Sequence, residues 1–165
     1  MTVAIYPGSF DPVTYGHLDV IGRAAGVFER VVVGVLANPR KAPLLSTAER
    51  LTVLRTAIDE TLPAAAPRID VVAFDGLTVD FARASGGHFI VRGLRAVSDF
   101  ESEMQMAHTN RKLAAEVDTV FFMTALEHAY LSSTLVKEIA LLGGDVSAMI
   151  PPAARGHVGT HRTVG

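Results

Sequence analysis

The residues best suited to chemistry lie in a loop rich in glycine and proline near the amino terminus. Residues 6–17 read YPGSFDPVTYGH, and an apolar repeat with helical spacing follows. Free backbone N–H groups and the positive end of the helix dipole favour a bound phosphate at such a helix start. Gly16 allows close approach of a ligand, and His17 can donate a hydrogen bond to a phosphoryl oxygen. The alternative is a plain strand-to-helix turn with a capping histidine.

Cationic residues follow two apolar runs, where a phosphate chain would need them. Lys41 comes shortly after the run 31–37, and Arg92 and Arg95 come after the run 88–91. Guanidinium groups bind phosphate oxygens in bidentate fashion, so two arginines at one strand end suit an anionic ligand. Taken singly, each of these cations is also compatible with an ordinary exposed charge.

A run of hydroxyl side chains precedes the last expected helix. Ser132, Ser133 and Thr134 stand together, and Lys137 follows one turn later. Serine hydroxyls and free N–H groups at a helix start suit a phosphate chain. Helix capping explains one such residue but leaves three consecutive hydroxyls unexplained.

These motifs together resemble a known enzyme family. The loop is similar to the signature of the nucleotidyltransferase superfamily, with its T-x-G-H element. Four further segments resemble the phosphopantetheine adenylyltransferases in order and spacing: NPRK at 38–41, IVRGLR at 90–95, DFESEMQMA at 99–107 and LSSTLVKE at 131–138. The T-x-G-H element alone is typical of the superfamily, whereas RGLR followed by DFExExQxA is much more specific. The resemblance covers residues 3 to about 150.

The resemblance implies a reaction in which the phosphate of 4′-phosphopantetheine attacks the α-phosphorus of ATP. Pyrophosphate leaves, dephospho-coenzyme A forms and no covalent enzyme intermediate is needed, which agrees with a chain without cysteine. His17 would stabilise the transition state electrostatically. Mg²⁺ is expected on the ATP phosphates, with no metal site built by the protein.

The same resemblance implies which residues contact the substrates. The expected ATP contacts are Ser9, Phe10, His17, Gly93, Leu94, Arg95, Glu103, His128, Ala129, Tyr130, Leu131, Ser132, Ser133 and Thr134. The expected acceptor contacts are Ser9, Lys41, Thr78 and Arg92.

Three positions depart from the family pattern or have another explanation. His128 stands where tryptophan or tyrosine is usual, and Tyr130 stands where phenylalanine is common, although both keep a flat ring for adenine packing. Thr78 is equally well explained as a helix-capping hydroxyl.

Two other functions fit part of the sequence. One is a nucleotidyltransferase of the same fold that uses nicotinamide mononucleotide or a phosphorylated small alcohol as acceptor. The other is a non-catalytic nucleotide-binding module. Lys41 together with the RGLR run favours the pantetheine phosphate.

The elements that must position these residues alternate along the chain. Strands are expected at 3–6, 31–37, 69–74, 88–91 and 119–123, with helical stretches between them. Capping-box patterns at Ser46 with Glu49 and at Ser98 with Glu101 mark two helix starts. The alternation predicts an α/β fold, a doubly wound, Rossmann-like parallel sheet with helices on both faces, in a single domain spanning 1–165. No regular structure is assigned to 151–165.

Composition limits the remaining possibilities. The chain has 165 residues, of which 49% are hydrophobic and 19% charged, with a net charge of −2. That charge argues against a nucleic-acid surface, and no apolar run reaches the roughly 20 residues that span a bilayer. We therefore expect a cytoplasmic enzyme. The low charge and the mean hydropathy of +0.32 agree with the homohexamer that the resemblance implies.

Overall fold

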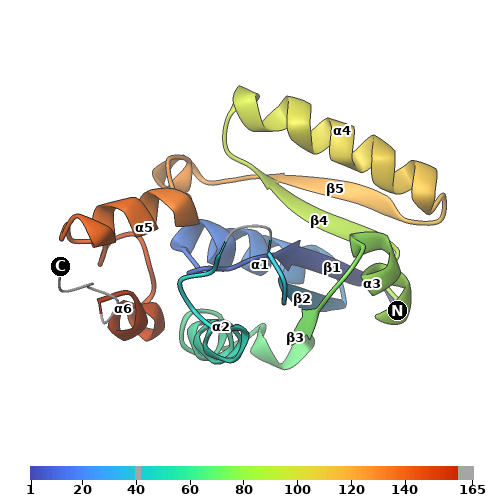
Figure 1. Ribbon diagram of the computed structural model, residues 1–165. Helices are drawn as coiled ribbons and strands as arrows, with labels where there is room; N and C mark the ends of the chain where they lie inside the picture. Colours follow the sequence, from blue (N-terminus) through green and yellow to red (C-terminus); the bar gives the residue numbers. More distant parts are fainter. Residues whose placement is uncertain (40–41, 160–165) are drawn as a thin grey trace.

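The computed structural model describes residues 1–39 and 42–159 and contains one five-stranded sheet. The strands are β1 (Val3–Gly8), β2 (Arg30–Leu36), β3 (Ile69–Phe74), β4 (Phe89–Leu94) and β5 (Asp118–Met123). Their order is β3-β2-β1-β4-β5, and every neighbouring pair is parallel. The predicted doubly wound, Rossmann-like fold is confirmed (Figure 1).

Helices cover both faces of the sheet. They are α1 (Tyr15–Val27), α2 (Thr47–Thr61), α3 (Thr78–Ala84), α4 (Val97–Leu113), α5 (Ser133–Leu141) and α6 (Pro152–Gly159), with short 3-10 turns η1 (Ala66–Arg68) and η2 (Leu126–His128). Helices α1 and α2 pack on β2 and on each other, whereas α3 packs on β1 and α4. Helix α6 contacts both α2 and α5 beyond the edge of the sheet (Figure 1).

Alternating side chains of the central strands enter two separate cores. Ala4 and Tyr6 belong to the core that α1 and α2 cover, while Val3 and Ile5 belong to the core that α3 covers. The valines at 31–35 are divided between these cores in the same alternating way. A parallel strand buried on both faces reads as a continuous apolar run, which is why these strands were predictable.

Strand β1 extends past the predicted stop at Pro7. Pro7 pairs with Gly34 and Gly8 with Val35 in the register with β2. The Pro7 carbonyl accepts a hydrogen bond from Arg92 on β4, so the backbone groups of Pro7 face β4. The β1–β4 ladder has already ended at Ile5, so the missing N–H of proline removes no ladder bond there.

One of the two predicted capping boxes forms. The Ser46 side chain accepts from the Glu49 N–H and the Glu49 carboxylate accepts from the Ser46 N–H, as predicted. The box at Ser98 and Glu101 is wrong, because the cap of α4 is Ala96, which has extended backbone angles. Ser98 thus falls inside the first turn, where it is not the cap residue.

Helix α6 corrects the expectation that 151–165 lacks regular structure, as far as 159; residues 160–165 lie outside the described part. Ala154 and Val158 are buried in the same core as α2. Residues four apart share one helix face, and Pro152 suits the first helical position. A single pair of apolar residues is a weak sequence signal, so packing on α2 decides that this segment is helical.

Replacing the buried valine of α6 tests this contact. Val158→Ala should lower the free energy of unfolding by about 1–3 kcal/mol, because it leaves apolar surface unpacked against α2. Gly156→Ala is the matched control: a Cβ at Gly156 would have nothing within 4 Å, so this change should be neutral or stabilising. Urea unfolding of both variants measures the difference, and equal stabilities would contradict the packing.

Candidate active site

A hollow of about 260 Å³ opens at the carboxyl ends of β1 and β4. The chain leaves β1 for α1 on one face and leaves β4 for α4 on the other, so the strands diverge there. Such a switch point is where ligands bind in open parallel sheets. The structure brings these predicted residues to its walls: His17, Arg92, Gly93, Arg95, Glu103, Leu131, Ser132 and Ser133.

The backbone fixes the tautomer of His17. The Thr14 N–H donates to His17 Nδ1 over 3.0 Å, and the His17 N–H donates to Thr14 Oγ1 over 3.3 Å. Nδ1 is therefore an acceptor without a proton, and in the neutral ring the proton lies on Nε2. Capping of α1 thus makes Nε2 the ring's hydrogen-bond donor.

The surroundings keep His17 neutral. Burial, and then the positive charges of Arg95 and Arg92, lower its pKa from 6.5 to about 4. A neutral imidazole at neutral pH donates one hydrogen bond and carries no net charge. The two arginines that depress the pKa also provide the positive field that an anion requires.

Phe10 supports His17 from beneath. Its ring lies edge-on to His17 with centroids 5.0 Å apart and edge-on to Tyr6 at 5.4 Å. The Phe10 backbone has a φ of 48°, in the left-handed region that a bulky residue adopts only under structural constraint. Phe10 is 3% exposed and acts here as packing for the catalytic candidate.

Arg92 is already held by a carboxylate. Its Nε and Nη2 donate to the two Glu103 oxygens over 2.8 and 2.7 Å, and its Nη1 donates to the Pro7 carbonyl over 3.1 Å. The resemblance assigned Arg92 to the acceptor and Glu103 to the nucleotide, yet the two side chains form one bidentate pair. Glu103 therefore orients Arg92 in this state.

Arg95 links β4 to the loop before α5. It pairs with Asp99 on the first turn of α4, with Nε to Oδ2 at 3.0 Å, and its Nη1 donates to the Leu131 carbonyl over 2.8 Å. The Asp99 carboxylate also accepts from the Arg95 N–H. This pairing and its hydrogen bonds lower the pKa of Asp99 against the opposing effect of burial, which is the largest single influence.

Close packing at the floor of the hollow requires glycine at one predicted position. A Cβ at Gly93 would lie 3.0 Å from Val20 Cγ2 on α1. Gly16 is less constrained, since a Cβ there would meet neighbours only at ordinary contact distances of 3.4 Å and more. Gly93 therefore sets how near α1 lies to β4.

The start of α5 divides the predicted hydroxyls between two hollows. Ser132 caps the helix by accepting from the Leu135 N–H, and Ser133 Oγ donates to the Pro12 carbonyl. Ser133 and Thr134 also line a second hollow of about 330 Å³, together with Ser9 and Lys137. Lys137 Nζ lies 3.1 Å from Asp11 Oδ2, which connects α5 to the first loop.

Some predicted contacts lie away from the main hollow. His128 stacks on Tyr15 with centroids 6.1 Å apart, and Tyr130 is 55% exposed. Leu94 is buried in the sheet, and Thr78 is the first residue of α3. Ala129 follows η2 without lining either hollow. Lys41 lies outside the described residues.

Known proteins are similar to this chain over most of its length. Residues 5–139 match the family model described as cytidylyltransferase-like. A phosphopantetheine adenylyltransferase of Lachnoclostridium phytofermentans is 55% identical over 151 residues, which are 92% of this chain and 90% of that relative. The chain belongs to the phosphopantetheine adenylyltransferases of the cytidylyltransferase-like family.

A second relative agrees with this assignment, and a solved structure has the same fold. A phosphopantetheine adenylyltransferase of Gloeobacter violaceus is 55% identical over 149 residues, covering 90% of this chain and 89% of the relative. A solved Plasmodium falciparum nicotinic acid mononucleotide adenylyltransferase, complexed with NaAD, matches with a TM-score of 0.77 and 14% identity, covering 98% of this chain and 96% of that chain. At that identity the structural likeness shows the shared fold.

Several residues that line the two hollows were not predicted from the sequence. Tyr6, Asp99 and Thr124 line the main hollow, and Asp11 lines the second one. Burial raises the pKa of Tyr6 to about 12, so its hydroxyl stays protonated. The position of Asp99 one turn after Arg95 was a usable signal for an ion pair. No sequence signal pointed to Thr124, because it reaches the hollow only through the pairing of β5 with β4.

The lowered pKa of His17 has a consequence for stability. The unfolded chain takes up a proton on this histidine as the pH falls through 6.5, whereas the folded chain resists until about pH 4. The free energy of unfolding should therefore fall by about 2 kcal/mol more between pH 7 and pH 5 in the native chain than in His17→Asn. Urea unfolding at both pH values measures this, and parallel pH slopes would refute the buried neutral histidine.

Proposed function

We propose that this chain transfers the adenylyl group of ATP to 4′-phosphopantetheine, giving dephospho-coenzyme A and pyrophosphate in coenzyme A synthesis. The relatives that carry the name of this activity are about half identical over nine-tenths of the chain. The single observation that carries the chemistry is the convergence of His17, Arg92, Arg95 and the Ser132–Ser133 helix start on one hollow. Adenylyl transfer needs such positioning and charge neutralisation more than a protein nucleophile.

The nucleotide phosphates fit the cationic wall. Arg95 and the free N–H groups at the start of α5 would hold the triphosphate, and His17 Nε2–H would donate to an oxygen whose charge grows in the transition state. A neutral donor is suited to this role, since it gains strength as charge develops on its acceptor. The phosphate of the acceptor would attack in line with the departing pyrophosphate, without a covalent intermediate.

The acceptor phosphate would reach the reaction from the Arg92 side. Arg92 keeps N–H groups beyond those bound to Glu103 and the Pro7 carbonyl, because a guanidinium has five. By resemblance Ser9, Lys41 and Thr78 would complete this side. Of these, Ser9 is exposed at the second hollow, next to the main one.

Magnesium would enter with ATP. Among residues 1–39 and 42–159 there is no cluster of three or more histidine or carboxylate side chains that could hold a metal ion. Mg²⁺ carried on phosphate oxygens and water would supply further neutralisation of the triphosphate.

We also propose a homohexamer acting in the cytoplasm. Exposed apolar side chains gather on α4 and the edge strand β5, including Phe100, Met104, Met106 and Met123, which agrees with burial by other subunits. Sedimentation would test for a mass near six times 17.5 kDa.

Within the described residues, no helix has the length and apolar character needed to cross a bilayer. Cell fractionation would test the location.

The activity is tested by giving the purified protein ATP, Mg²⁺ and 4′-phosphopantetheine, with nicotinamide mononucleotide as a parallel acceptor. Mass-resolved chromatography should detect dephospho-coenzyme A and pyrophosphate in equal amounts with the first acceptor alone. Turnover with only the second acceptor would show that 4′-phosphopantetheine is not the acceptor. Binding of ATP without turnover of either would leave a nucleotide-binding module.

The role of His17 predicts an unequal effect on turnover and binding. His17→Ala should lower kcat about 100- to 1,000-fold while KM for either substrate changes less than about threefold, because the hydrogen bond strengthens only in the transition state. His88→Ala is the control, since His88 is exposed at the opposite end of β4. Steady-state kinetics that show equal losses in kcat and in binding would refute this role.

A further inference from the structure

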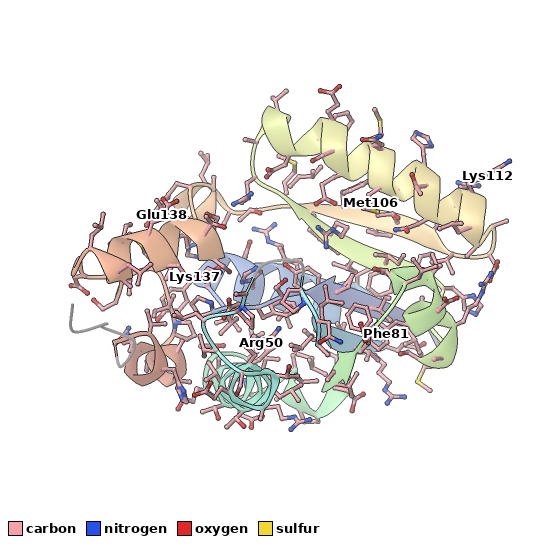
Figure 2. The ribbon with its side chains drawn as sticks, viewed as in Figure 1. Arg50, Phe81, Met106, Lys112, Lys137 and Glu138 are labelled. Carbon is pink, nitrogen blue, oxygen red and sulfur yellow. The ribbon has the colours of Figure 1, made fainter. Side chains whose placement is uncertain are left out.

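A buried arginine lies beneath the site without an assigned role. Arg50, on the first turn of α2, is 1% exposed and is the largest fully buried side chain among those described. Figure 2 shows it between α2 and the end of the sheet. The other buried charge in the described part of the chain is Asp11, which is 3% exposed.

All the hydrogen bonds of Arg50 go to neutral oxygens. Its Nη1 donates to the carbonyls of Ser9 over 2.9 Å and Leu36 over 2.8 Å. Its Nε donates to the Leu45 carbonyl over 3.2 Å, and its Nη2 donates to Thr47 Oγ1 over 3.1 Å. One guanidinium therefore joins the chain after β1, the end of β2 and the segment before α2.

The Nη1 bonds lie at the point where two strands separate. The β1–β2 register ends with Gly8 opposite Val35, so Ser9 and Leu36 are the next residues on each chain. Beyond this pair the chain after β1 continues into the loop that precedes His17. Arg50 binds both carbonyls where the ladder no longer can, and so sets the separation of these two chains.

Asp11 also binds the segment before α2. Its two carboxylate oxygens accept from the N–H groups of Leu44 and Leu45, each over 2.8 Å. Leu45 thus gives its N–H to a buried carboxylate and its carbonyl to a buried guanidinium. The segment before α2 is tied to the first loop through both ends of this residue.

Filling space in the core does not explain why residue 50 is an arginine, because burying its charge is energetically unfavourable. No carboxylate oxygen of the described residues lies within the 4.0 Å of an ion pair to this guanidinium. Burial lowers the pKa of Arg50, and the negative charge of Asp11 offsets only part of that effect. Burying a charge without a directly bound counter-ion is unfavourable, and an apolar side chain would fill the volume at lower cost. The planar guanidinium supplies what an apolar side chain cannot, which is a fixed geometry among the carbonyls of Ser9, Leu36 and Leu45.

We propose that Arg50 is a positioning residue that holds Ser9 and the Leu44–Leu45 segment in register at the reacting edge of the sheet. It touches no substrate and acts through these backbone groups. The expected effect of Arg50 on turnover rests on the proposed adenylyl transfer, in which Ser9 contacts both substrates. The expected effect of Arg50 on the order of these segments does not depend on that activity.

Arg50→Lys tests the proposal because it keeps the charge and removes the fork. In this variant the amides of 42–46 should exchange with deuterium at least about tenfold faster, because the carbonyl of Leu45 loses its anchor. Turnover should fall at least about tenfold, with KM for ATP and for 4′-phosphopantetheine within about threefold, because loop displacement affects alignment more than binding. Arg50→Ala should recover part of the lost kcat when ethylguanidinium is added.

Two control variants on the same helix separate positioning from stability. Val53→Ala removes buried volume from α2, and Arg55→Lys alters an arginine that donates to the Val71 carbonyl far from the site. Both should keep kcat within about twofold at a temperature where circular dichroism shows them folded. Native turnover in folded Arg50→Lys, or an equal loss in Val53→Ala, would overturn the positioning role. Unchanged exchange would overturn it even if the native chain adenylylates neither acceptor, so the two proposals fail separately.

Discussion

Pairing of β1 with β4 ends at Ile5 and Ile90, whereas pairing of β1 with β2 continues to Gly8 and Val35. The backbone of β1 beyond Ile5 therefore faces β4 without a ladder, and this opening forms the floor of the hollow. Arg92 occupies part of it by donating to the Pro7 carbonyl. The divergence of helices to opposite faces at this place then supplies the walls, as doubly wound sheets do generally.

Charge in the hollow is arranged before any ligand arrives. Each arginine is tied to a carboxylate on α4, with Arg92 bound to Glu103 and Arg95 to Asp99. These pairs restrain the guanidinium groups, so less side-chain entropy is lost when phosphate binds. The remaining field is positive enough to lower the pKa of His17 further than burial alone would. A neutral histidine and two oriented cations are therefore parts of one electrostatic arrangement.

The local patterns of the sequence identified most elements because each pattern has a local physical cause. Continuous apolar runs predict strands buried on both faces, and the Ser46–Glu49 box predicts the start of α2. The T-x-G-H element likewise contains the whole cap of α1, since Thr14 and His17 bond to each other three residues apart. The box at Ser98 failed, because a serine and glutamate at this spacing do not exclude a helix that begins two residues earlier, after Ala96.

The sequence by itself thus determined the fold class and the order of the elements, because apolar runs and helix caps are local patterns, whereas its resemblance to a family singled out His17, Arg92, Arg95 and Ser132. Only the tertiary structure decided which of these groups meet. Glu103 faces Arg92 from eleven residues away, and Arg50 reaches Ser9 from forty-one residues away. Such contacts depend on how the helices pack on the sheet. That packing involves residues of both cores that are far apart in the chain, so no short stretch of sequence predicts it.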